Sequence, residues 1–279
     1  MDGLEIYKTM DYFINRPFHL PGIKIMTDCC ELAENLSTYY GGFFSNSEST
    51  QTLDIHIEKV GGNDFKISFL DNVVQSNNPI QEIGNIVYEN TKIENGIFAL
   101  HAGAVSINQK AIIFIAPTSN GKTTLTTYFV QNGFDYVTDD CTLIDMEKLI
   151  VYPYTKPIHL REGGMDVLKK YNSEPKKTLY LNTPTIQRYV FTPINCAKES
   201  LSIDQIIFID RNDKRNEVIS LKPADTMQML MKSPIVSNKI DHQYIQFIHR
   251  LAKQNCKKIL YMDMDYVFEY VKNEVFKNG

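Results

Sequence analysis

The chain has 279 residues, a formal net charge of -4, 43% hydrophobic residues and 22% charged residues, a composition that is ordinary for a globular protein of one large or two small domains. The mild negative charge and the lack of a dense Lys/Arg tract disfavour a nucleic-acid partner. Since no apolar run reaches the roughly 18 residues of a membrane helix and the N-terminus lacks the pattern of a signal peptide, we expect a cytoplasmic protein without a membrane partner.

The first hundred residues predict a small α+β module. Strands are predicted at Ile23–Thr27, Leu53–Val60 and Phe65–Leu70, because these stretches are apolar or alternate apolar and polar residues. The GGND sequence between the last two strands predicts a hairpin, and isoleucines at helical spacing after Pro79 predict a helix. We assign this module to residues 1–97. It would either dock a substrate or bury one face of the domain that follows.

A second unit of predicted strands and helices spans residues 98–279. Strands are predicted at 98–107, 110–116, 134–140, 203–210, 216–223 and 257–263, and a hairpin at 141–154. Helices are predicted at 123–133, within 160–171, and at 224–232, 241–255 and 264–276. Residues 172–200 are rich in Pro, Asn, Thr and Lys, which predicts a loop or flap.

A phosphate-binding loop is predicted between the strand at 110–116 and the helix at 123–133. The sequence there reads A-x-x-x-x-G-K-T, the phosphate-loop pattern with Ala in place of the first Gly. In this pattern, backbone N–H groups and the helix N-terminus hold phosphate oxygens, Lys122 reaches the β- and γ-phosphates, and the Thr123 hydroxyl ligates Mg²⁺. The motif therefore predicts ATP and Mg²⁺ as cofactors. The predicted nucleotide-binding residues are Ala116, Pro117, Thr118, Ser119, Asn120, Gly121, Lys122, Thr123 and Thr124.

Carboxylates are also required, both for Mg²⁺ and for the incoming nucleophile. One candidate is the pair Asp139–Asp140, at the end of FDYVTDD, and the other is Asp210, at the end of IDQIIFID. Pattern alone slightly favours Asp210, although an Asp before a turn is commonly structural. Two adjacent carboxylates repel unless a cation lies between them or one is protonated. The Asp139–Asp140 pair is therefore less easily explained as a chance arrangement than the single Asp210. Both candidates stay open.

The segment Leu100–Asp145 resembles the catalytic domain of the HPr kinase/phosphorylase family. A His-Ala segment precedes the loop strand, the loop helix ends at Gly133, and the next strand ends in Asp-Asp. Residues Lys156–Leu168 are similar to the next segment of the relatives, with a strand, a basic residue and a Gly-containing helix start. The resemblance implies an α/β (overall α+β) phosphate-loop core of the HPr kinase/carboxykinase type at residues 98–279, with the smaller N-terminal module beside it.

The resemblance also implies catalytic roles. Asp139 would be the general base for the acceptor hydroxyl, and Asp140 would help to hold Mg²⁺. His101 would lie beside the phosphate site, where it contacts phosphate or steers the base. Arg161 would stabilise charge on the transferring phosphate, together with Lys122. Arg188 and Arg250 are weaker candidates without a motif.

Two departures from the family shape the expected substrate. The N-terminal hundred residues do not look like the regulatory domain of HPr kinases, and His159 stands where an acidic residue is expected. HPr is therefore not the expected acceptor, and strong reverse phosphorolysis is not expected. The chain is more similar to the shorter kinases found with ribosomal-peptide tailoring systems, including lasso peptide kinases, which phosphorylate a Ser of a precursor peptide.

The sequence thus predicts an ATP-dependent kinase that phosphorylates a Ser hydroxyl of a peptide or small protein. One alternative is a regulatory module that binds a nucleotide without transferring phosphate. The other is a small-molecule kinase, since the similar carboxykinases share this nucleotide site. The identity of the acceptor and the formation of a homo-oligomer stay open.

Overall fold

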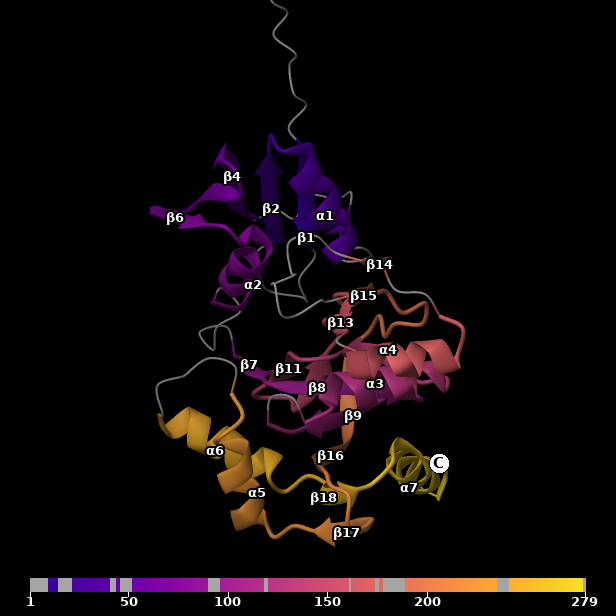
Figure 1. Ribbon diagram of the computed structural model, residues 1–279. Helices are drawn as coiled ribbons and strands as arrows, with labels where there is room; N and C mark the ends of the chain where they lie inside the picture. The colour runs from indigo at the N-terminus through magenta and orange to yellow at the C-terminus, as the bar shows by residue number, and fades with distance from the viewer. Residues whose placement is uncertain are drawn as a thin grey trace, which may run out of the picture.

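The computed structural model describes residues 10–14, 22–40, 44–45, 52–89, 96–117, 120–160, 162–173, 176–177, 189–234 and 241–277. The fold is of the mixed α/β class, as predicted. A six-stranded sheet comes from the N-terminal part of the chain, and a nine-stranded sheet and a three-stranded sheet come from the rest (Figure 1). Every helix in the described part of the chain is too short or too polar to span a lipid bilayer.

The N-terminal sheet has the strand order β3-β1-β2-β4-β5-β6, and only the β2–β4 pair is parallel. The predicted hairpin is confirmed as β4 and β5, and the predicted helix after Pro79 is α2. The sequence prediction does not contain helix α1, β1, β3 or β6. The bounds are β1 Met10–Ile14, β2 Gly22–Thr27, α1 Cys30–Tyr40, β3 Phe44–Ser45, β4 Thr52–Gly61, β5 Asp64–Phe69, β6 Asn72–Ser76 and α2 Pro79–Glu89.

The core of this module continues into the nine-stranded sheet. Buried residues of β2, β4, α1 and α2 form one apolar cluster with residues on or next to three strands of the larger sheet, β7 (Ile97–Leu100), β11 (Thr142–Asp145) and β12 (Ile150–Tyr152). Cys141, Leu143 and Tyr154 are the members with the least exposure on that side. The module therefore buries part of the larger sheet, whereas a docking role for residues 1–97 stays a prediction.

Three parallel strands form the centre of the larger sheet. Strand β16 (Leu201–Arg211) pairs in parallel with β9 (Lys110–Ile115) on one side and with β18 (Cys256–Tyr261) on the other. Strands β8 (Ala102–Ile107) and β10 (Asp135–Thr138) continue the sheet beyond β9, and β17 (Glu217–Ser220) continues it beyond β18. The carboxyl ends of β9, β16 and β18 share one edge, where ligands bind in open α/β sheets.

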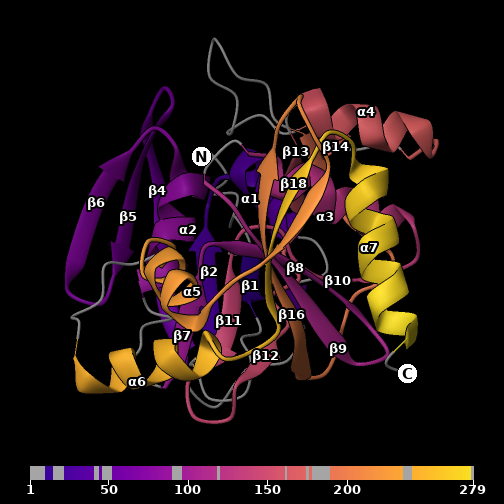
Figure 2. The ribbon, with the colours of Figure 1, turned by 90° about the horizontal axis from the view of Figure 1, so that it is seen from below.

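Helices cover both faces of this sheet (Figure 2). Alternate residues of each central strand point to opposite faces, so Ile113 and Phe208 contact one layer, while Phe114 and Ile207 contact the other. The first layer holds α5 (Pro223–Leu230) and α6 (His242–Leu251). The second holds α3 (Lys122–Gln131), α4 (Glu162–Lys170) and α7 (Met264–Lys277). The two layers leave the carboxyl edge of the parallel strands accessible between them.

Two segments differ from the prediction. The strand predicted at 98–107 is broken at His101: β7 pairs with β11, whereas β8 turns back onto β9 through Asn108 and Gln109, which both have positive φ. The loop predicted at 172–200 contains β14 (Lys176–Lys177) and β15 (Tyr189–Phe191), which join β13 (Ile158–Leu160) in the three-stranded sheet. These strands have only two or three residues, too few for a periodic pattern.

Candidate active site

The predicted phosphate-binding loop lies between β9 and α3, at the carboxyl edge of the parallel strands. Gly121 has φ +85°, a conformation that glycine adopts without strain, and α3 begins at the next residue. Ala116, Pro117, Asn120 and Gly121 are described, whereas the predicted ligands Thr118 and Ser119 lie outside the described residues. The strand–loop–helix context that the motif requires is therefore present.

Lys122 folds back over the loop. Its ammonium group donates to the backbone carbonyl of Ala116 at 2.7 Å and to that of Pro117 at 3.3 Å, and its side chain is buried. Burial lowers the pKa of Lys122, although Asp140 and then Asp139 oppose this shift. A lysine held in this way has already lost the rotamer freedom that phosphate binding would otherwise remove.

Asp139 follows β10 and faces the loop helix. Its Oδ2 accepts from the Thr123 hydroxyl at 3.5 Å, and only 2% of the residue is exposed. The Tyr136 hydroxyl lies 3.3 Å from Oδ1 of Asp139 and donates to the carbonyl of Lys156 at the shorter distance of 2.7 Å. Burial, and next the charge of Asp140, raise the pKa of Asp139 to about 7.

Asp140 is bound by a lysine that the sequence analysis did not single out. The ammonium nitrogen of Lys156 lies 2.9 Å from each carboxylate oxygen of Asp140, and Lys156 is buried. Burial by itself raises the pKa of Asp140, but the attraction of Lys156 and its hydrogen bond outweigh that effect, so the pKa lies below its ordinary value. The two adjacent carboxyls are thus unlike: Asp140 is held ionised, and Asp139 titrates near neutrality.

His101 lies next to this pair because the chain breaks there between β7 and β8. Its Nδ1 lies 3.1 Å from the backbone carbonyl of Asp140. A carbonyl can only accept, so Nδ1 carries the hydrogen in this contact. Burial, and next the charge of Lys122, lower the pKa of His101, which favours the neutral ring. The contact fixes the backbone of the turn that presents both carboxyls.

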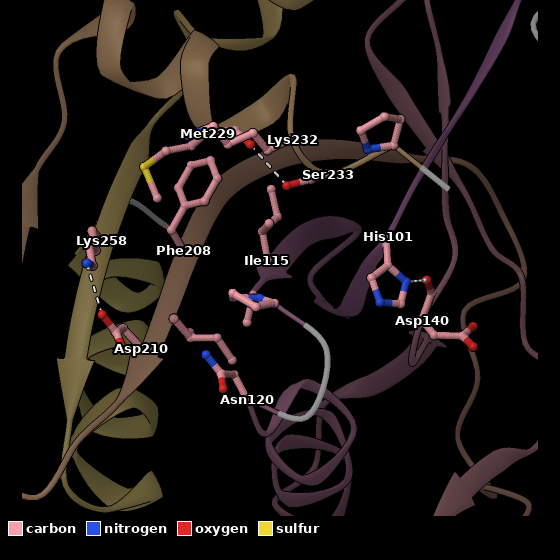
Figure 3. A pocket seen from close by; sticks show the side chains of 14 residues that line it. His101, Ile115, Asn120, Asp140, Phe208, Asp210, Met229, Lys232, Ser233 and Lys258 are labelled. Atoms are coloured by element: carbon pink, nitrogen blue, oxygen red, sulfur yellow. Dashed lines mark hydrogen bonds and ion pairs between the residues drawn. The ribbon is translucent and has the colours of Figure 1, made fainter. Parts of the chain in front are cut away.

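A cavity of about 740 Å³ opens in front of the loop (Figure 3). His101 and Asp140 lie at one end, and Asp210 lies at the other end, in an ion pair with Lys258 at 3.0 Å. Asn120 of the loop lies between the two ends. Ala116 and Pro117 of the loop also line the cavity. We call this space the first cavity. Its remaining lining residues are Ile115, Phe208, Ile209, Met229, Lys232, Ser233 and Pro234.

The predicted arginines are not part of this described geometry. Arg161 and Arg188 lie outside the described residues. Arg250, in α6, donates to the backbone carbonyls of Met146 and Glu147 at 3.2 and 2.6 Å, which ties α6 to the turn between β11 and β12. Its role in catalysis stays a prediction.

The chemistry of these groups suits a nucleoside triphosphate with Mg²⁺. The loop offers backbone amides, a helix N-terminus and the Lys122 ammonium for phosphate oxygens. The Thr123 hydroxyl and the two carboxyls are hard oxygen ligands of the kind Mg²⁺ prefers. Thr123 Oγ1 and Asp139 Oδ2 lie 3.5 Å apart. The loop and the acidic pair are therefore close enough to bind one metal ion and one phosphate group together.

Comparisons with known proteins assign no family to the chain. No model of a known protein family matches the chain, and no curated protein matches it. Among solved structures, the chain is similar to the HPr(Ser) kinase/phosphatase from Coxiella burnetii, with 17% sequence identity and a TM-score of 0.32. That match covers 64% of this chain and 97% of the other.

Proposed function

We propose that the protein is an ATP-dependent kinase that transfers the γ-phosphoryl group to a Ser hydroxyl of a peptide or small protein. The observation that carries the proposal is the approach of Thr123 to Asp139, with their oxygens 3.5 Å apart. Because of this approach, the lysine and the helix N-terminus of the predicted phosphate-binding loop lie close to a pair of carboxyls. A loop that only bound phosphate would not require a carboxyl with a pKa near neutrality beside it.

In the proposed reaction, the acceptor oxygen forms a bond to the γ-phosphorus, and the bond from that phosphorus to the β–γ bridging oxygen breaks to release ADP. Asp139 takes the proton of the acceptor hydroxyl. A general base works best when its pKa lies near the working pH, and the pKa of Asp139 is raised to about 7. Lys122 stabilises the charge that spreads over the phosphoryl oxygens.

Mg²⁺, when bound, would neutralise charge on the phosphates, and we propose Thr123 and Asp140 as its protein ligands. A metal ligand must be ionised, and Lys156 keeps Asp140 in that state. His101 holds the backbone at Asp140 and is a positioning residue in this scheme.

We propose that the acceptor enters through the first cavity, because this cavity contains Asp140 and His101 and reaches the loop. Apolar side chains such as Ile115, Phe208 and Met229 line its wall, so we propose an acceptor with apolar residues next to its Ser. A volume of about 740 Å³ also fits a small hydroxylated molecule, so small molecules form a second set of acceptors to be tested.

The experiment incubates the protein with Mg·ATP and a library of Ser-containing peptides, and mass spectrometry detects the gain of one phosphoryl group. Small hydroxylated acceptors form a parallel set. We expect transfer to a peptide by the wild type, and none by Lys122→Ala with an unchanged circular dichroism spectrum. Transfer that persists in Lys122→Ala would refute the role of the loop. Binding of Mg·ATP without transfer to any acceptor would favour the non-catalytic nucleotide-binding module.

A further inference from the structure

A second cavity lies beside the first turn of α3. Its volume is about 430 Å³, within the range of sites for small molecules and cofactors. Residues of α3 and α4 line it, together with the carboxyl ends of β16 and β18 and the start of α7. They are Gly121, Thr124, Tyr128, Asp166, Val167, Lys170, Arg211, Tyr261, Met262, Asp263, Met264 and Asp265.

The second cavity begins at the phosphate-binding loop. Gly121 belongs to the loop and lines the cavity. The Tyr261 hydroxyl is so close to it that a Cβ at Gly121 would lie 2.9 Å from this oxygen. Thr124 and Tyr128, which share one face of α3 at i, i+4 spacing, also line the cavity. A molecule bound along the loop therefore has direct access to this space.

We infer that the second cavity binds the nucleoside half of the nucleotide, an inference that rests on the proposed function. The γ-phosphate end is set by Lys122 and by Thr123, whose hydroxyl contacts Asp139. The α- and β-phosphates of such a ligand lie at the junction of loop and helix. A triphosphate that starts beside Asp139 and follows this junction leads to Thr124 and into the second cavity.

The topology of the sheet supports a nucleotide that runs from Asp139 towards the second cavity. Ligands of open α/β sheets bind outside the carboxyl ends of parallel strands, and Arg211 and Tyr261 end β16 and β18 at the second cavity. The first cavity holds Asp140 and His101, which the transfer step needs. A nucleoside placed there would occupy the space of the acceptor.

The lining offers the groups that a base and a ribose need. The thioether side chains of Met262 and Met264 present polarisable surface for a flat aromatic base. Asp263 uses one carboxylate oxygen to accept from the backbone N–H of Tyr266 at 2.9 Å, and its second oxygen can accept from a ribose hydroxyl. Asp265 is bound by the Tyr128 hydroxyl, which fixes a second acceptor in the same wall.

Met262 is the position for the test, because it is a large apolar side chain that is 48% exposed and lines the second cavity. Met262→Trp fills the cavity without disturbing buried packing. Met231, which is 37% exposed at the end of α5 and belongs to neither set of lining residues, gives the matched control Met231→Trp. Calorimetry measures the dissociation constants of Mg·ATP and of Mg·tripolyphosphate, which lacks a nucleoside.

We expect Met262→Trp to weaken Mg·ATP binding at least tenfold and to leave Mg·tripolyphosphate binding within twofold, while Met231→Trp changes neither. Met262→Ala, which removes apolar contact without adding bulk, should weaken Mg·ATP binding two- to fivefold and tests the same contact if the Trp variant does not fold.

Unchanged Mg·ATP affinity in the folded Met262 variants, or an equal loss for both ligands, would overturn the inference. Selective loss of Mg·ATP affinity without any phosphoryl transfer by the wild type would keep the inference and refute the kinase. Failure of the wild type to bind either ligand would refute both.

Discussion

Lys156 binds both carboxylate oxygens of Asp140 at 2.9 Å, and only 5% of the lysine side chain is exposed. This contact decides how the two adjacent carboxyls differ. It keeps Asp140 ionised, and the negative charge of Asp140 adds to the larger effect of burial in raising the pKa of Asp139 to about 7. The lysine therefore supports the proposed division between a metal ligand and a general base.

Lys156→Met tests the importance of this ion pair for stability. Removing one partner of a buried pair leaves an uncompensated charge, which costs about 3–5 kcal/mol when both groups are fully buried. The Asp140 side chain is 35% exposed, so we expect a smaller loss of about 1–3 kcal/mol in the free energy of unfolding. Urea denaturation measures the free energy of unfolding of Lys156→Met, of Asp140→Asn and of the double variant Lys156→Met/Asp140→Asn.

The double variant should lose less stability than the sum of the two single variants, because it has no carboxylate at residue 140 that has lost its lysine. Additive losses would show that the two groups do not interact strongly. A Lys156→Met variant as stable as the wild type would contradict the prediction directly.

Asp139→Asn should stop phosphoryl transfer and leave nucleotide binding nearly intact. An amide cannot accept the hydroxyl proton, and loss of a general base costs about 10²–10⁴-fold in rate. We expect the catalytic constant to fall by at least a hundredfold, while the dissociation constant of Mg·ATP changes less than threefold. Single-turnover kinetics and calorimetry provide the two readouts.

Asp210→Asn is the comparison for this experiment, because Asp210 pairs with Lys258 at the far end of the first cavity. We expect less than a tenfold loss of rate. If Asp210→Asn stops transfer and Asp139→Asn does not, an ordinary Walker B arrangement is correct. If Asp139→Asn loses Mg·ATP affinity while Asp140→Asn stops only the chemistry, the two adjacent carboxyls have exchanged roles.

The raised pKa of Asp139 also predicts how stability depends on pH. In the unfolded chain this carboxyl ionises near pH 4, whereas in the folded protein it holds its proton to about pH 7. The folded state therefore binds more protons between these values, and this group lowers stability as pH rises through that window. His101 has the opposite effect and makes stability rise with pH, because its pKa is lower in the folded protein than in the unfolded chain.

The difference between the wild type and Asp139→Asn isolates the carboxyl, since both proteins keep His101. Without Mg²⁺ or nucleotide, Asp139→Asn should be the more stable protein at pH 8, by several degrees in Tm. The gap should be small at pH 4.5, where the carboxyl is protonated. Thermal unfolding at both pH values checks this, and a gap that is equal at the two would contradict the raised pKa.

The sequence predicted the phosphate-binding loop because its signals are local. The motif at residues 116–123, the apolar strand before it and the helix after it lie within about 25 consecutive residues, and the structure contains this strand–loop–helix unit. Asp139 and Asp140 were candidates because they come at the exit of the predicted strand that directly follows the loop helix, and in the structure they directly follow β10.

Other features depend on contacts that the sequence does not display. Lys156 lies in an irregular segment between β12 and β13, where a lysine carries no motif, and only the tertiary fold brings it to Asp140. The break at His101 depends on β7 and β8 pairing with different strands. Helix α1 was absent from the prediction because its described buried stripe, Leu32, Ala33 and Leu36, is short. The second cavity combines residues from positions 121 to 265, a separation that no local pattern spans.

Gly103 provides a test of how closely the site depends on the strand beneath it. It lies in β8, and a Cβ at this position would be 2.5 Å from the Thr126 hydroxyl of α3 and 3.2 Å from the backbone carbonyl of Asp139. Gly103→Ala should therefore push the loop helix and the Asp139 turn away from β8. We expect a loss of about 1–3 kcal/mol in the free energy of unfolding, typical of an overpacked core, and more than a tenfold loss of transfer rate, because catalysis is sensitive to displacements of about 1 Å.

Thr126→Ala separates this clash from a general effect of the new methyl group. The Thr126 hydroxyl is buried and has no hydrogen-bond partner among the described residues, so the single variant should lose little stability. In Gly103→Ala/Thr126→Ala the nearer contact is gone, and we expect urea denaturation to show that most of the lost stability returns. Transfer should recover only in part, because the contact with the carbonyl of Asp139 remains. A Gly103→Ala protein with full stability and rate, or a double variant with no recovery, would contradict the packing of α3 and Asp139 against β8.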